Sequence, residues 1–213
     1  MARVVLLALT AASVVQAQSA FEGTLSMALS GDNGRSTDVT YMVKDGKIRV
    51  EMPGGRGGMG VMIMDVAEKK MLILMAAQKM YMEQSMAGAM AVAQSANRPK
   101  ATVTRTGRTE SIAGQVCEHV TVTEEGGRSS DVCVAKGLGA FQMPSAGGRG
   151  GAPQAQGWED AVGEGGFPLK VQQGDKVVML VTAIEKKAMD AALFAPPADY
   201  EKMDMGAMMR KRP

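Results

Sequence analysis

The residues best suited to chemistry in this chain lie close together, within residues 114–135 (GQVCEHVTVTEEGGRSSDVCVA). This stretch contains both cysteines, Cys117 and Cys133, the only histidine, His119, and the carboxylate of Asp131. These residue types in this grouping are compatible with three kinds of site: a disulfide, a zinc site or a catalytic thiol. The choice depends on how the surrounding chain places the four side chains.

The stretch has the pattern of a β-hairpin, because two strand-like segments flank the turn-rich sequence E-E-G-G-R. A loop at residues 124–126 places Cys117 opposite Cys133 and His119 opposite Asp131. Directly opposed residues have Cβ atoms about 5 Å apart, which is close to what a disulfide requires. Closing a loop of about 15 residues contributes about 3 kcal/mol to stability. We therefore expect a disulfide between Cys117 and Cys133.

The two other kinds of site fit the pattern less well. Residues two apart on a strand hold their side chains about 6–7 Å apart, which is wider than a compact tetrahedral zinc site, and the closely spaced cysteine pairs of common zinc sites are absent. A catalytic thiol would be consumed by the disulfide. Zinc stays open as an alternative that two titratable thiols would support. We expect His119 to face solvent, paired weakly with Asp131.

The N-terminus predicts export from the cytoplasm. Arg3 precedes an apolar run at residues 4–15, and a small-residue cleavage site ends at Ala17. This is the pattern of a secretory signal peptide, residues 1–17. The run is shorter than the ~20 residues that span a bilayer, and no later segment is apolar for long enough. We expect a periplasmic or secreted protein, in a compartment that favours disulfides.

Composition and motifs narrow the classes of function. A formal net charge of +2 gives no electrostatic basis for a nucleic-acid partner. The motifs of common serine hydrolases, zinc proteases and P-loop enzymes are absent from the sequence. We therefore expect a protein that is not an enzyme and that has no cofactor.

Apolar and polar residues alternate in the first third of the chain, which predicts half-buried strands. The short turns G-D-N-G and D-G join three such strands into an antiparallel meander. Further strands follow, and we expect a single domain at residues 18–203. It contains a flexible glycine-rich insert at residues 143–157 and is followed by a disordered, methionine-rich basic tail at residues 204–213.

One segment predicts a helix. Met82, Met86 and Met90 recur every four residues within residues 82–96, which is a helical stripe. A sheet of about ten strands curls. The expected fold is mainly β (α+β): a curved antiparallel sheet that forms an open half-barrel, with one or two helices over its concave face.

Several segments resemble a known family: VKDGKIRVEM, MIMDVAEKKMLILMAAQKMYM, TGRTESIAGQVCEHVTV, DVCVAKGLGAF, GGFPLKV and LFAPPADY. They are similar to a family of secreted bacterial domains of unknown function whose fold is related to periplasmic lipoprotein carriers (LolA-, LolB- and LppX-like). The resemblance covers about residues 21–200. It implies an open half-barrel whose concave face holds acyl chains, and no site residue is carried over from it.

The chain contains 20 methionines, while aromatic residues make up only 4% of it. This composition suggests two binding functions. Methionine suits surfaces that accept varied apolar shapes, so the first hypothesis is a binding module for a lipid, an acyl chain or a lipoprotein. An envelope protein is a further candidate partner. The candidate lining residues are Leu25, Met27, Leu29, Val39, Tyr41, Val43, Met82, Met86 and Met90. The alternative is Cu(I) binding or oxidant buffering by soft thioethers, with Met203, Met205, Met208 and Met209 as the metal ligands. A solid core without room for a ligand is equally compatible with the apolar pattern.

Overall fold

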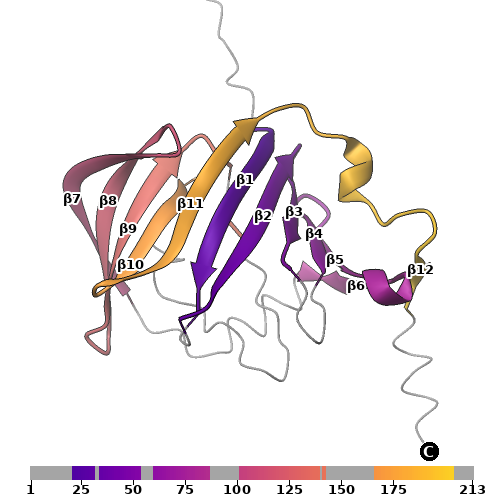
Figure 1. The fold of residues 1–213 in the computed structure, drawn as a ribbon, viewed down its shortest axis with the longest axis horizontal. Helices are drawn as coiled ribbons and strands as arrows, with labels where there is room; N and C mark the ends of the chain where they lie inside the picture. Colours follow the sequence, from indigo (N-terminus) through magenta and orange to yellow (C-terminus); the bar gives the residue numbers. More distant parts are fainter. Residues whose placement is uncertain are drawn as a thin grey trace, which may run out of the picture.

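The structure is a computed structural model that describes residues 21–31, 34–53, 60–86, 101–139, 141–142 and 166–203. The predicted signal peptide, the glycine-rich insert and the tail at residues 204–213 lie outside these ranges. Within them, twelve strands form one open sheet in the order β12-β6-β5-β4-β3-β2-β1-β11-β10-β9-β8-β7 (Figure 1). The expectation of a mainly β protein built on one large sheet is therefore confirmed.

The sheet consists of two sequential meanders that meet where β1 pairs with β11. All neighbouring strands are antiparallel except β12, which runs parallel to β6. Two short 3-10 helices, η1 and η2, lie between strands. The strands of the first meander are β1 (Gly23–Ser30), β2 (Ser36–Lys44), β3 (Lys47–Glu51), β4 (Val61–Asp65), β5 (Lys70–Met75) and β6 (Met80–Ser85). The remaining elements are β7 (Ala101–Ile112), β8 (Gln115–Glu124), β9 (Ser129–Lys136), β10 (Gly166–Gln173), β11 (Lys176–Lys186), β12 (Glu201–Lys202), η1 (Ala76–Gln78) and η2 (Ala191–Phe194).

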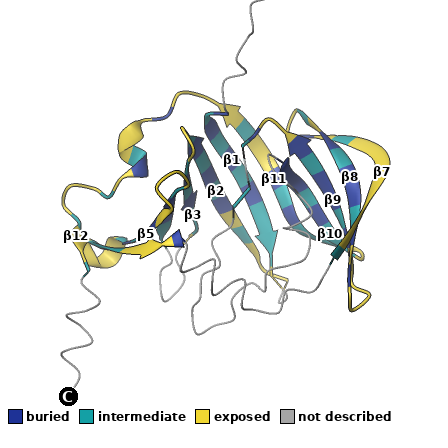
Figure 2. Cartoon of the chain, turned by 180° about the vertical axis from the view of Figure 1, so that it is seen from behind, coloured by how far each residue is buried: buried dark blue, intermediate teal, exposed yellow. Residues whose placement is uncertain are grey.

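Tight turns set the register of the first meander. Asp45 and Gly46 both have positive φ, 47° and 74°, as the two-residue turns that match strand twist require. This turn places Val43 opposite Ile48. Buried and partly buried residues then alternate along β1 and β2, as Figure 2 shows. The predicted meander of three strands is confirmed.

One face of the first meander carries a continuous apolar row, which we call the inner row. Each member lies directly opposite the next on the neighbouring strand, so the row crosses six strands from β1 to β6. Its members are Leu25, Tyr41, Val50, Met62, Ile73 and Met82. We call the face that bears it the inner face. Its buried side chains join those of β8–β11 in a single core cluster.

The outer face of the same strands is covered by the chain that follows β11. Figure 1 shows this segment passing through η2 on its way to β12. Phe194 and Met189 form a second core cluster with Ile63 and Leu74, and the Arg49 guanidinium donates a hydrogen bond of 2.7 Å to a backbone carbonyl of η2. This covering explains why β4 is buried on both faces, as its unbroken apolar sequence predicts.

The predicted helix at residues 82–96 is wrong at its start. Residues 80–85 form β6, paired with β5, and Met82 lies opposite Ile73 in the inner row. A spacing of four residues is also a multiple of two, so the methionine stripe fits one face of a strand as well as a helix. Met86 is the first helical residue after β6, and Met90 lies outside the described residues. Among the described residues, no helix covers the inner face, and none is long and apolar enough to cross a membrane.

Candidate functional site

The described candidates for apolar ligand binding share the inner face. In β1 and β2 these are Leu25, Met27, Leu29, Val39, Tyr41 and Val43, which the register places side by side. All of them are buried except Leu29, which is partly exposed. Met86 belongs to the same buried cluster, whereas Met82 is partly exposed in β6. The sequence thus identified one common surface, although its members differ in accessibility.

The centre of the inner face is filled by the protein's own aromatic rings. Phe141 and Phe167 lie 6.2 Å and 5.4 Å from Tyr41, measured between ring centroids, and 5.2 Å from each other. The backbone N–H of Gln142 donates to the Tyr41 hydroxyl at 3.2 Å. Burial raises the pKa of Tyr41 well above its ordinary value. A ligand therefore has no free access to Tyr41, and the sequence did not identify this aromatic cluster.

The inner face changes character toward β6, where methionines replace the aromatic rings. Met62 and Met64 lie on β4, and Met64 is directly opposite Met71 of β5. These three side chains are buried, whereas Ile73 and Met82 are partly exposed. We call these five residues the methionine end of the inner face. Its methionine side chains are unbranched and polarizable, properties that suit contact with varied apolar shapes, and two of the five residues are partly exposed.

Only one of the four proposed metal ligands of the tail lies within the described residues. Met203 follows β12, and its backbone N–H donates to the carbonyl of Tyr81 at 2.8 Å. The other three candidates, Met205, Met208 and Met209, lie outside the described residues.

The predicted disulfide between Cys117 and Cys133 is present, with a Cα–Cα distance of 5.3 Å. The predicted register of the hairpin is wrong by two residues: His119 lies opposite Cys133, and Asp131 lies opposite Thr121. The cause is the loop, which is closed by the Glu124 N–H donating to the Arg128 carbonyl. Gly127 then takes the left-handed position, with φ of 78°. Because the shift is two residues, the same side chains remain on the same face.

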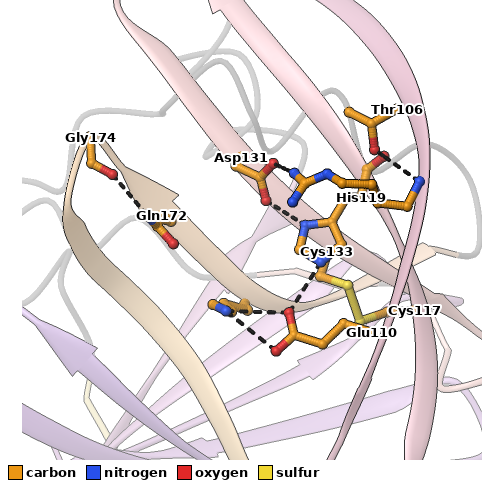
Figure 3. A network of polar contacts seen from close by, with 10 residues as sticks. Thr106, Glu110, Cys117, His119, Asp131, Cys133, Gln172 and Gly174 are labelled. Carbon is orange, nitrogen blue, oxygen red and sulfur yellow. Dashed lines mark hydrogen bonds and ion pairs between the residues drawn. A yellow bond between two sulfur atoms is a disulfide. The ribbon is translucent and has the colours of Figure 1, made fainter.

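His119 does not face solvent as expected, because its side chain is only 7% exposed. The ring lies between two carboxylates: Nδ1 is 2.5 Å from Asp131 Oδ1, and Nε2 is 3.1 Å from Glu110 Oε2. Arg108 also contacts Asp131, and Lys170 Nζ lies 3.2 Å from Glu110 Oε2. Figure 3 shows this network beside the disulfide.

The same side chains line a polar pocket with a volume of about 520 Å³, together with Thr109 and Gln172. His119 and Asp131 were identified from the sequence, but the pocket-lining residues on β7 and β10 were not. A bulge between Arg105 and Thr109, which includes Gly107 with φ of 71°, interrupts the regular pairing of β7 just before Glu110. A glycine inside a strand pattern was the available signal for this irregularity.

The comparisons with known proteins concern fold and family. No curated protein matches the chain in sequence. Eighteen solved chains match its structure. An uncharacterized conserved protein from Thermus thermophilus has a TM-score of 0.51 and 10% identity, over 89% of this chain and 93% of that protein.

PNGF-II has a TM-score of 0.50 and 14% identity. The match covers 90% of this chain but only 32% of the PNGF-II chain. These likenesses show a shared fold alone. The family match is more specific, because it extends over residues 21–200. The chain belongs to the family described as a domain of unknown function, DUF4412.

Proposed function

We propose that this protein is an exported binding module, and not an enzyme, that holds an apolar ligand against the methionine end of its inner face. The ligand class is a lipid or an acyl chain, free or attached to a lipoprotein. One observation carries the proposal: the inner row is apolar across six strands and is partly exposed at Ile73 and Met82. Near Tyr41, by contrast, the protein's own aromatic rings pack against the row.

The physical reason for a ligand at this end is the cost of exposed apolar surface. Each 100 Å² of apolar area removed from water stabilises a complex by about 2.5 kcal/mol. Methionine side chains adapt to a flexible chain with little strain because they are unbranched. The proposal includes the half-barrel arrangement of the lipoprotein carriers, in which helices cover the concave face. It also includes export by the signal peptide at residues 1–17, which the disulfide supports.

The experiment is displacement of a fluorescent fatty acid from the purified mature protein. The wild-type protein should bind the probe and release it to unlabelled fatty acid. Met82→Asp, which places a charge at the accessible methionine, should lose this binding. Val116→Asp is the matched control, because Val116 is a strand residue that is 62% exposed away from the inner face. Binding that is absent in the wild type, or equal in both variants, would reject the proposal.

Copper(I) binding is the second candidate, and one observation favours it. Met64 lies directly opposite Met71, with Met62 on the same side of β4, so three soft thioethers occupy neighbouring positions. Competition with a chromogenic Cu(I) chelator tests this candidate. Truncation after Tyr200 separates the tail methionines from those of the sheet. An absence of competition by the full-length mature protein would end the copper hypothesis.

A further inference from the structure

The disulfide lies directly beside the charged network of the polar pocket. Glu110 is opposite Cys117 in the pairing of β7 with β8, and His119 is opposite Cys133 in the pairing of β8 with β9. Ligand atoms of Glu110, His119 and Cys133 all lie within 4.8 Å of one another. The two cross-strand pairs therefore bring a carboxylate, an imidazole and the sulfur of Cys133 together, and Cys117 is bonded to that sulfur.

We propose that reduction of the disulfide converts this point into a Zn²⁺ site with Cys117, Cys133, His119 and Glu110 as its four ligands. In the oxidised protein the two sulfur atoms are bonded to each other and cannot act as thiolates. A dithiol reductant transfers two electrons and two protons to the disulfide and is itself oxidised to a disulfide. The two resulting thiols release their protons when the metal binds.

The donor set suits zinc in both chemistry and geometry. Thiolate, imidazole and carboxylate are the ligands that tetrahedral Zn²⁺ takes in proteins, whereas Mg²⁺ and Ca²⁺ prefer oxygen alone. Bond lengths of about 2.3 Å to sulfur and 2.0 Å to nitrogen place tetrahedral ligand atoms about 3.5 Å apart. Small side-chain rotations bring atoms that are within 4.8 Å of one another to this separation. The flat-strand objection concerns only Cys117 and His119, which both lie on β8, because Glu110 and Cys133 come from the neighbouring strands β7 and β9.

The surrounding side chains already hold the ligands in place. Asp131 accepts from Nδ1 of His119, and Arg108 contacts Asp131 in turn. This contact orients the ring so that Nε2 points toward Glu110, as an outer carboxylate does for metal-binding histidines. Lys170 lies beside Glu110, where its charge offsets the single excess negative charge of Zn²⁺ bound by two thiolates and one carboxylate. The polar pocket provides the entry path.

The proposal is tested with Co²⁺, a spectroscopic substitute for Zn²⁺. The mature protein is reduced, freed of reductant under anaerobic conditions and titrated with the metal. We expect thiolate-to-cobalt charge-transfer absorption and intense tetrahedral d–d bands that saturate at one equivalent and disappear when Zn²⁺ is added. The oxidised protein should show neither. The same bands in the oxidised protein, or no charge-transfer band in the reduced protein, would overturn the proposal.

Variants distinguish metal binding by the proposed four-ligand site from metal binding by the two thiols alone. His119→Gln and Glu110→Gln should each weaken Co²⁺ binding, while Glu118→Gln, which alters a carboxylate that pairs with Arg105 instead, should leave it unchanged. Asp131→Asn should weaken affinity about 10–100-fold, because Asp131 acts through His119. Circular dichroism of the same samples reports the sheet. Equal affinity in all four variants, or loss of the β signal in the reduced, metal-loaded protein, would mean that the thiols bind metal without this site.

Discussion

Two methionines of the inner row allow a matched test of whether one part of the inner face is core and another part is a binding surface. Met62 and Met82 flank Ile73 in adjacent positions of the row, on β4 and β6. Met62 is 2% exposed, whereas Met82 is partly exposed near the end of the sheet. If the inner face is a core that becomes a binding surface toward β6, the same substitution should affect mainly stability at Met62 and mainly ligand binding at Met82.

Truncation to alanine should therefore separate stability from binding. Met62→Ala leaves a cavity in a closed environment and should lower the free energy of unfolding by about 2–5 kcal/mol. Met82→Ala should lower it by only about 1 kcal/mol, since full burial of a methionine side chain is worth about 1.5–3 kcal/mol and Met82 is partly exposed already. The loss of about 1 kcal/mol of ligand contact at Met82 should weaken the Kd for a fatty acid about fivefold.

The measurements are urea unfolding followed by circular dichroism and fatty-acid displacement on the same preparations. The slope of the unfolding free energy against urea should be unchanged, so that the midpoint reports stability alone. The reasoning is refuted if Met82→Ala destabilises the protein as strongly as Met62→Ala and leaves the Kd for the fatty acid unchanged. That result would mean that the methionine end is ordinary core.

Three further predictions concern the framework around the site. Replacing Cys117 and Cys133 together by serine should lower the free energy of unfolding by about 3 kcal/mol, given their separation of 16 residues; unchanged urea midpoints would contradict the chain-entropy argument. Because burial raises the pKa of Tyr41 above 10.0, the stability due to its neutral phenol is complete below about pH 10 and lost as the pH rises further. Above pH 10, the free energy of unfolding should decrease more steeply with pH in the wild type than in Tyr41→Phe. Parallel pH dependences in the two proteins would argue against this burial effect. Phe194, at 4% exposure, anchors η2 on the outer face, so Phe194→Ala should cost about 3–5 kcal/mol. Calorimetry should show a large decrease in Tm, and an unchanged Tm would mean that η2 contributes little to the fold.

The local patterns of the first meander were sufficient to predict its strands. Period-two alternation and the Asp45–Gly46 turn determine both the face and the register there. The segment after Met80 was harder, because methionines four residues apart satisfy a strand and a helix equally. The register of β8 with β9 was ambiguous for a similar reason. Gly126 and Gly127 can each occupy the left-handed position of a three-residue loop, and the two choices differ by two residues in register.

The candidate sites were predictable only where their members are close in sequence. Cys117 and Cys133 share one hairpin, so their bond follows from a local argument. Lys170 contacts Glu110 across 60 residues of sequence, and this contact depends on β10 pairing with β9, which no local pattern indicates. The two carboxylate partners of His119 are closer in sequence, at 9 and 12 residues, but Glu110 reaches the ring only through the pairing of β7 with β8, whose bulge was not predicted.

The central claim of an apolar ligand is tested most directly by mass spectrometry of an organic extract of the protein purified from its native source. We expect acyl lipid to co-purify with the wild-type protein in a constant ratio and to be depleted when Met82 is replaced by aspartate. Extracts without lipid from the wild type, or with equal lipid from both proteins, would contradict the account.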